Sequence, residues 1–275
     1  MKSPYVCISG VGSPKQEKPI ARKFEESGLA ELNRVVALGV EITPETFISR
    51  KENQYGRHWY PVCDDLPKVL KPNGDGARKI KPILQLNFGE FDFKHEDLHR
   101  EMGFCLGALA KCSRWHPEGV QINNYPLHHK DPEIILKIAR VARADTIIIQ
   151  CCEEVTQECN PKKLAVRIGK LADKQLIDYV IFGSSDGRVP LNTEALLPFI
   201  DAAYEEAGDK IGVGLAGDLS AQTVSQVRPA LKRYPSLSFN AEARLHKNGN
   251  SDKRLDLPKV GRFLFAIAHE IEMAV

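Results

Sequence analysis

The chain has 275 residues, of which 43% are hydrophobic and 27% charged, and its formal net charge at pH 7 is +2. This composition is ordinary for a globular protein, and the length favours one domain with one large core. No apolar stretch approaches the roughly 20 residues that a membrane span needs, and no long basic run favours nucleic acid. We therefore expect neither a membrane nor a nucleic acid among the partners.

The chain passes directly from Met1–Pro4 into its first apolar run, so no signal peptide is expected. Seven cysteines are present, most of them inside predicted strands or helices. An odd number of cysteines in such positions indicates buried thiols rather than a disulfide framework. The sequence thus predicts a cytoplasmic protein.

Eight short apolar runs recur along the chain, each separated from the next by enough sequence for a helix. They are Val6–Val11, Val36–Ile42, Ile80–Phe88, Gly119–Asn123, Thr146–Cys151, Tyr179–Phe182, Ile211–Ala216 and Leu237–Ala241. A strand and helix alternation repeated eight times predicts an α/β fold, a single (β/α)8 TIM barrel over residues 1–275. The active site of such a barrel lies at the C-terminal ends of its strands.

Several helices between these runs carry start and stop signals. Asn160 and Asn192 are expected to cap two helices, and Gly208 is expected to end the second. Ser220 fits the cap of a helix that ends near Tyr234–Pro235. Pro258 fits the first turn of the last helix.

One connection, residues 43–79, is far longer than the usual two to six residues of a loop between strand and helix. It contains a basic and aromatic cluster from Arg50 to Tyr60, and a helical turn is expected around Asp64–Leu70. Long loops at this end of a barrel commonly shape the site, so we expect a lid or a pocket wall that includes Arg50. The alternative is an insertion whose aromatic residues pack on the barrel rim.

Alternation along the strands assigns polar side chains to the barrel interior, late in each strand. The set predicted to line one mouth is Asn87, Gln121, Asn123, Gln150, Ser184, Asn240, Glu242 and Arg244. Gly212, Gly214 and Ala216 also face inward, which is expected to leave room for a ligand. These amides either bind a polar ligand or satisfy one another and trapped water.

Several segments resemble phosphoribosylanthranilate isomerase. They are Ala37-Leu38-Gly39-Val40 with Ile48-Ser49-Arg50, Asn87, Val120-Gln121-Ile122, Leu215-Ala216-Gly217-Asp218-Leu219-Ser220, and Lys253 to Phe263. The resemblance implies an Amadori-type isomerisation of a phosphorylated ribosyl amine, with a cysteine as general base and an aspartate as general acid. It also implies a phosphate-binding turn after the seventh strand.

The chain departs from that family at its functional positions. Ser9 stands where the family has its cysteine, and Asp186 follows the family's acidic position by two or three residues. Asp218 occupies the phosphate turn, where its carboxylate would repel a phosphate. Arg244 could bind an anion, but Glu242 is close enough in sequence to pair with it. A neutral or cationic ligand, sugar-like or amine-bearing, fits these residues better than a phosphate does.

Two classes of function follow. In the first, the protein is an isomerase or lyase acting on a small polar sugar-like or carbonyl metabolite, with Glu41, Glu242, Asp186 and Ser9 as catalytic candidates. In the second, the barrel binds a polar metabolite without transforming it. His95-Glu96-Asp97-Leu98-His99 matches a zinc pattern, but a metal-dependent hydrolase is less favoured. No metal or cofactor is assigned, and a homo-oligomer is left open.

Overall fold

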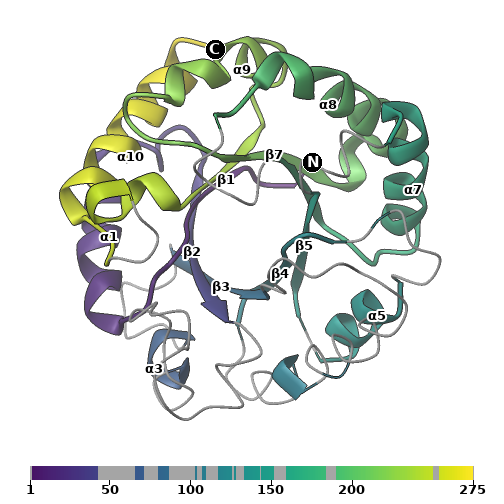
Figure 1. Ribbon diagram of the computed structural model, residues 1–275, viewed down its shortest axis with the longest axis horizontal. Helices are drawn as coiled ribbons and strands as arrows, with labels where there is room; N and C mark the ends of the chain where they lie inside the picture. The colour runs from purple at the N-terminus through teal and green to yellow at the C-terminus, as the bar shows by residue number, and fades with distance from the viewer. Residues whose placement is uncertain are drawn as a thin grey trace.

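The computed structural model describes residues 2–42, 66–70, 80–86, 103, 107–109, 117–125, 127, 133–142, 144–151, 159–183, 190–249 and 254–274. Eight strands form a closed barrel in which each strand pairs with its neighbours in sequence, and β1 closes on β8. Every pairing is parallel. Helices surround the barrel (Figure 1), so the predicted (β/α)8 TIM barrel is confirmed.

The strands coincide closely with the eight apolar runs. They are β1 Tyr5–Ile8, β2 Val35–Ile42, β3 Ile80–Leu86, β4 Gly119–Ile122, β5 Thr146–Cys151, β6 Tyr179–Phe182, β7 Gly212–Gly217 and β8 Ser238–Ala241. The helices are α1 Pro14–Glu26, α3 Leu66–Leu70, α5 Glu133–Val141, α7 Pro161–Asp173, α8 Thr193–Ala207, α9 Arg228–Arg233 and α10 Leu257–Glu272. Short 3-10 turns are η3 Gly208–Lys210, η4 Val224–Val227, η5 Ala243–Leu245 and η6 Lys247–Gly249.

The predicted caps of α7 and α8 are confirmed by their hydrogen bonds. Asn160 accepts from the backbone of Lys162 and Lys163, and Asn192 accepts from that of Ala195. Gly208 ends α8 with a φ of 56°. None of the helices in the described ranges is long and apolar enough to cross a membrane.

The helix expected to run from Ser220 to Tyr234–Pro235 is wrong as a single element. The Ser220 hydroxyl does accept from the backbone N–H groups of Gln222 and Thr223. The chain then forms the 3-10 turn η4 and begins α9 only at Arg228. Pro229 lacks an N–H group, and its ring would clash with a preceding helical turn, so it interrupts a continuous helix.

Two apolar layers lie on opposite faces of the strands. The larger one fills the space between the barrel and the helices. The smaller one plugs the barrel interior with residues of one parity in each strand, namely Tyr5, Cys7, Ala37, Ile83, Ile148, Tyr179, Ile181 and Ala216. The tyrosines stand at the starts of β1 and β6, so the N-terminal half of the barrel is closed by packing.

The inward glycines of β7 do not leave room for a ligand, contrary to expectation. A Cβ on Gly212 would lie 2.4 Å from the ring of Tyr179, and one on Gly214 would lie 3.1–3.4 Å from Ser238 and Ile181. The space that these glycines leave is therefore occupied by side chains of the adjacent strands.

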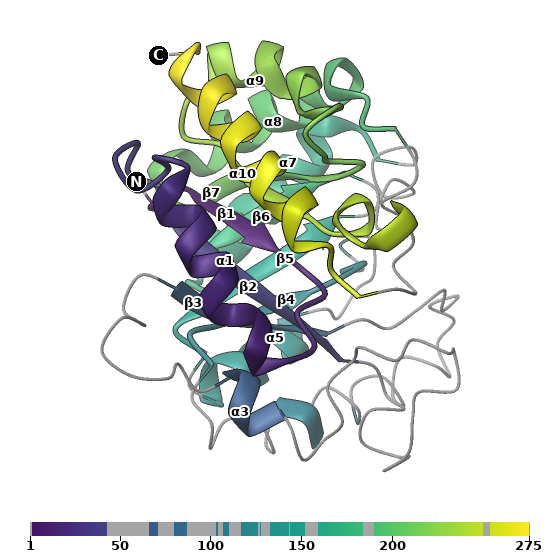
Figure 2. The same cartoon turned by 90° about the vertical axis from the view of Figure 1, so that its left-hand side faces the viewer.

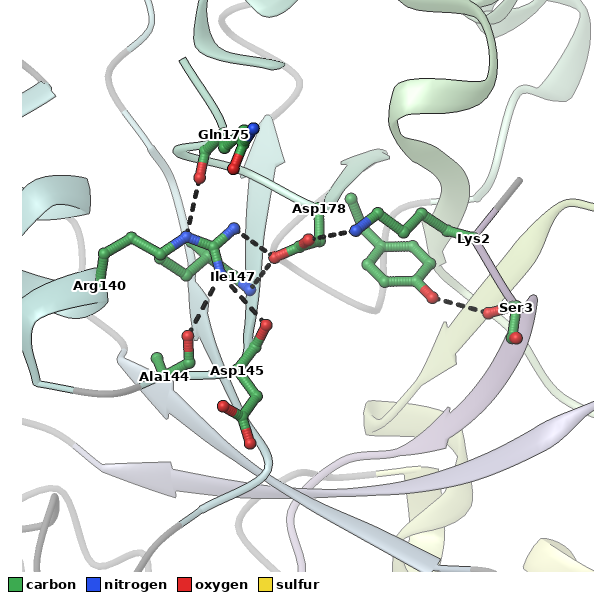
Figure 3. Close-up of polar contacts among 9 residues, drawn as sticks. Lys2, Ser3, Arg140, Ala144, Asp145, Ile147, Gln175 and Asp178 are labelled. Carbon is green, nitrogen blue, oxygen red and sulfur yellow. Dashed lines mark hydrogen bonds and ion pairs between the residues drawn. The ribbon is translucent and has the colours of Figure 1, made fainter. Parts of the chain in front are cut away.

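A buried carboxylate ties the N-terminal end of the barrel together (Figure 3). Asp178 lies 2.5 Å from both Lys2 Nζ and Arg140 Nη2, and it accepts the backbone N–H of Ile147 at 2.8 Å. Beside it the Tyr179 hydroxyl donates to the Ser3 carbonyl at 2.7 Å. This cluster anchors the start of the chain to β5 and β6, on the face opposite to the polar mouth.

Candidate functional site

A connected set of polar side chains occupies the barrel interior above the apolar plug. The Gln85 amide donates to Ser9 Oγ at 2.8 Å, and Ser9 Oγ donates to Asn240 Oδ1 at 2.5 Å. Asn240 in turn donates to Gln121 Oε1 at 3.3 Å. The chain of hydrogen bonds therefore links β3, the end of β1, β8 and β4 across the barrel.

The network continues toward the mouth from Gln121. Its amide donates to Asn123 Oδ1 at 2.7 Å and to Gln150 Oε1 at 3.1 Å. All of these polar side chains are buried. The structure thus brings Gln121, Asn123, Gln150 and Asn240 together, as their strand parity predicts, and adds Gln85 to them. Ligand binding by these residues stays a prediction, because in this state they satisfy much of one another's hydrogen-bonding capacity.

Ser9 and Cys7 lie side by side at the end of β1, where the resemblance places the general base. The Ser9 hydroxyl is engaged by Asn240 and Gln85. Burial raises the pKa of the Cys7 thiol to about 12, with a further increase from the charge of Glu242. Cys7 therefore stays a neutral thiol near pH 7, 3.7 Å from Ser9 Oγ. That neither position supplies the general base of the phosphoribosylanthranilate isomerases stays a prediction.

Two carboxylates stand near the C-terminal ends of the strands that flank β1. Glu41 is buried near the end of β2, where the register places it opposite Gln85. Glu242 follows β8 and is half-buried. A Cβ on Gly10, which has a φ of 78°, would lie 3.7 Å from the Glu242 Cγ and 2.6 Å from the His246 Nε2. Glycine at this position thus permits Glu242 and His246 to pack against the end of β1.

His246 is the residue that sequence reasoning missed. It is fully buried beside Glu242 and Gly10, although it lies beyond the last strand. Strand parity does not extend to it, and it belongs to no motif. A polar residue a few positions after an apolar run was the only available signal.

The expected partner of Arg244 is wrong. Its guanidinium contacts both carboxylate oxygens of Asp218, and Glu242 has no part in that pair. The extended chain ends at Glu242, whose φ and ψ are −140° and −85°, and Ala243–Leu245 form a 3-10 turn. Strand alternation therefore stops before Arg244, and its side chain lines a separate surface hollow with Asn248 and Lys259.

The segment that resembles a phosphate-binding turn uses four of its backbone N–H groups in hydrogen bonds within the segment. Ser220 N–H donates to Thr223 Oγ1 at 2.9 Å, and Leu219 N–H donates to the Gly217 carbonyl at 2.7 Å. The N–H groups of Gln222 and Thr223 are held by Ser220 Oγ. The ion pair with Arg244 also compensates the negative charge of Asp218, which weakens the repulsion expected between this carboxylate and a phosphate. The stronger obstacle to phosphate binding is that these backbone N–H groups already have acceptors.

Four predicted site residues lie outside the described residues, namely Arg50, Asn87, Ser184 and Asp186, as does the motif His95–His99. Most of the long connection 43–79 is also outside them. Only Leu66–Leu70 of that connection is described, and it forms α3 within the helical turn expected around Asp64–Leu70. In the described ranges, no group of three or more His, Cys, Asp or Glu side chains is arranged to hold a metal ion.

Solved structures share this fold at low sequence identity. The carboxyl transferase domain of Rhizobium etli pyruvate carboxylase, with oxamate and biotin, has a TM-score of 0.58 and 12% identity, covering 99% of this chain and 48% of that one. A mutant tryptophan synthase α-subunit from Pyrococcus furiosus has a TM-score of 0.53 and 13% identity, covering 98% and 96%.

The chain thus spans about half (48%) of the carboxyl transferase structures that it matches. No known family profile matches the chain, and no curated protein does. The neighbours are TIM-barrel enzymes, and similarity at this level of identity shows the fold alone.

Proposed function

We propose that this barrel is an isomerase or lyase that acts on a small polar metabolite, sugar-like or carbonyl-bearing. The observation that carries the proposal is the buried polar network that ends near Asn123 and Gln150. The carboxylates Glu41 and Glu242 accompany it at the ends of the two strands that pair with β1. In TIM barrels this end of the strands holds the active site. Amide side chains both donate and accept hydrogen bonds, as hydroxyl and carbonyl ligands require.

In the proposed reaction, a carboxylate removes a proton from the carbon next to a carbonyl group and returns it to a neighbouring atom. Glu242 is the first candidate for this base, because it is half-buried at the mouth. Glu41 is the candidate for the complementary acid. Amide donors of the network would stabilise the negative charge that develops on the carbonyl oxygen.

The residues outside the described ranges complete the proposed site. The loop Arg50–Tyr60, which is part of the insertion 43–79 in a single barrel domain, would roof the mouth and contribute Arg50. Asn87 and Ser184 would add hydrogen-bonding groups, and Asp186 a second acid.

The ordinary reaction of the phosphoribosylanthranilate isomerases is not expected to be efficient, because Cys7 is a neutral thiol and Ser9 is hydrogen-bonded. Vigorous complementation of a tryptophan auxotroph that lacks this isomerase would contradict that expectation.

The second candidate function is binding without catalysis. The observation that favours it is the mutual satisfaction of the amides, which gives them a structural role even when no substrate is bound.

The replacement Glu242→Gln tests the proposal. We would incubate the protein in D2O with a panel of aldoses, ketoses and hydroxy acids, and follow deuterium incorporation next to the carbonyl by proton NMR. Removal of a general base typically lowers the rate by about 10²–10⁴-fold. We expect a loss of this size with ligand binding retained, and no change in the control Glu205→Gln, whose side chain is exposed on α8. Wild-type protein that binds a panel compound without exchange would instead support the non-catalytic function.

A further inference from the structure

The last helix, α10, presents a stripe of apolar and charged side chains on the outside of the barrel. Figure 2 shows α10 beside α1 on this surface, with no described element lying over its outer face. Phe263 and Ile267 are fully buried, which fixes the side of the helix that faces the core. The side chains of the opposite side recur at helical spacing and form the outer stripe of α10, namely Arg262, Phe265, Ala266, His269, Glu272 and Met273.

Two large apolar side chains of the outer stripe are in contact with water. Phe265 is 50% exposed and Met273 is 60% exposed. Phe265 also borders an open depression of about 570 Å³ over the first half of α10, which is lined by Pro258, Gly261 and Ala266 as well. The stripe thus has a hollow near the start of the helix and a protruding methionine near its end. A contiguous apolar patch of this kind marks an interaction surface.

Charge is distributed unequally along the same stripe. Arg262 lines the depression, and Lys23 of α1 reaches it, because a Cβ on Gly261 would lie 3.1 Å from the Lys23 Nζ. Glu272 is exposed at the other end of α10. Within the described residues, no ion pair involves Arg262, Lys23 or Glu272. The first half of the stripe is therefore basic and its last turn acidic.

The order of residues on the stripe is self-complementary about its centre. Arg262 and Glu272 lie equally far before and after Ile267. The same is true of Gly261, in the depression, and Met273. In two antiparallel copies of α10 related by a two-fold axis at this level, each Arg262 would stand level with Glu272 of the other copy. Each Met273 would likewise stand level with the depression of the other copy.

We propose that two copies of this chain associate through the outer stripe of α10 in this antiparallel arrangement. Each Met273 covers the depression of the other copy, and the two Phe265 side chains pack together near the axis, which removes apolar surface from water. Each Arg262 pairs with Glu272 of the other copy, and Lys23 adds a second positive charge beside the pair. The positive N-terminal end of each helix also lies beside the negative C-terminal end of the other.

The self-complementary order is what identifies the partner as a second copy. A two-fold interface pairs residue i with j and j with i, so both halves of the pattern must occur on one surface. The outer stripe of α10 meets this condition by itself. The interface lies on the flank of the barrel and does not include the mouth, so it is independent of the reaction proposed there.

Sedimentation equilibrium of the full-length chain over about 1–200 μM tests the proposal. We expect a reversible equilibrium between the chain of 30.7 kDa and a species of twice that mass. Arg262→Glu and Glu272→Arg should each weaken the dimer about tenfold or more, because two symmetry-related attractions become repulsions. Both side chains are exposed, so neither change disturbs the core. Mixing the two variants should restore the wild-type affinity, because every charged pair of the mixed dimer is again attractive.

The apolar part of the interface has its own variant. Met273→Ala should weaken the dimer about tenfold or more, because two methionine side chains lose their burial. The matched control is Val141→Ala, which shortens an apolar side chain that is 84% exposed on α5. We expect the control to leave the affinity unchanged, and weaker association in it would place the contact on another face of the barrel and contradict the proposal.

Three further results would overturn the proposal. The first is a chain that stays monomeric up to about 200 μM. The second is a dimer whose affinity neither charge reversal changes, because its interface would then lie elsewhere. The third is a mixture of the two charge-reversed variants that dimerises no better than either variant alone, because an antiparallel two-fold pair requires that recovery.

Discussion

Replacing Asp178 by alanine should destabilise the barrel more than any other single loss of an ion pair described above. One of its oxygens binds Lys2, and the other binds both Arg140 and the backbone N–H of Ile147 (Figure 3). The side chain is only 10% exposed. In the variant, Arg140 would still donate to the carbonyls of Ala144 and Gln175, so leaving its guanidinium without Asp178 costs little stability.

The magnitude follows from these contacts. The buried Ile147 N–H would lose its acceptor, which costs about 1–3 kcal/mol. The pairs with Lys2 and Arg140 involve cations with 39% and 27% of their side chains exposed, so solvent screens them. Each such pair adds about 0.2–1 kcal/mol. Together these losses lower the free energy of unfolding by about 1.5–5 kcal/mol. For a large domain this corresponds to about 3–20 °C in melting temperature.

Urea denaturation followed by circular dichroism measures this change, with Asp173→Ala as the matched control. Asp173 also forms one 2.5 Å pair, with Lys210, but both side chains are 59% exposed. The control should lose at most about 0.5 kcal/mol. Two results would refute the stabilising role assigned to the buried Asp178 cluster at the N-terminal end of the barrel. One is an equal loss of unfolding free energy in the two variants, and the other is a loss below about 1 kcal/mol in Asp178→Ala.

Two further predictions concern the barrel interior. Gly212→Ala should lower the free energy of unfolding by about 1–3 kcal/mol, because its new methyl group would overlap the Tyr179 ring; unchanged stability in urea would contradict this packing. The Cys7 thiol has its pKa raised from 9.0 to about 12 by burial, so the unfolded chain releases its proton first as pH rises. Stability should therefore fall between these values, by up to about 1.4 kcal/mol per pH unit from this group. Urea titrations at several pH values should show a shallower decline in Cys7→Ala, and parallel curves would count against the raised pKa.

The architecture was predictable because its signals are local and repeated. Each apolar run is short, and a single run such as Tyr179–Phe182 would be weak evidence by itself. Eight runs in regular alternation leave few folds other than a closed barrel. Parity also predicted the interior positions of Gln121, Gln150 and Asn240, because side chains alternate strictly along a strand.

The failures occur where the outcome depends on contacts between distant segments or on the point at which a strand ends. Gly212 is small and faces inward, but the ring of Tyr179 on the adjacent strand β6 fills the space beside it. In the sequence, Arg244 continues the alternation of β8 and was therefore predicted to face the barrel interior. In the structure the strand ends before it, and Arg244 belongs to the 3-10 turn η5. Its partner Asp218 comes from the segment after β7, which sequence spacing does not connect to it. His246 was missed because it also lies beyond the end of β8, where strand alternation no longer predicts which way a side chain faces.

The central claim is that the polar network marks a ligand site, and a crystal structure with a bound compound tests it most directly. Crystals would be grown from protein equilibrated with the aldoses, ketoses and hydroxy acids of the exchange experiment. The account predicts density for one compound at the C-terminal mouth, hydrogen-bonded to Asn123 or Gln150 and within reach of Glu242. An empty mouth in which the network is unchanged, with the compound bound elsewhere on the surface, would contradict it.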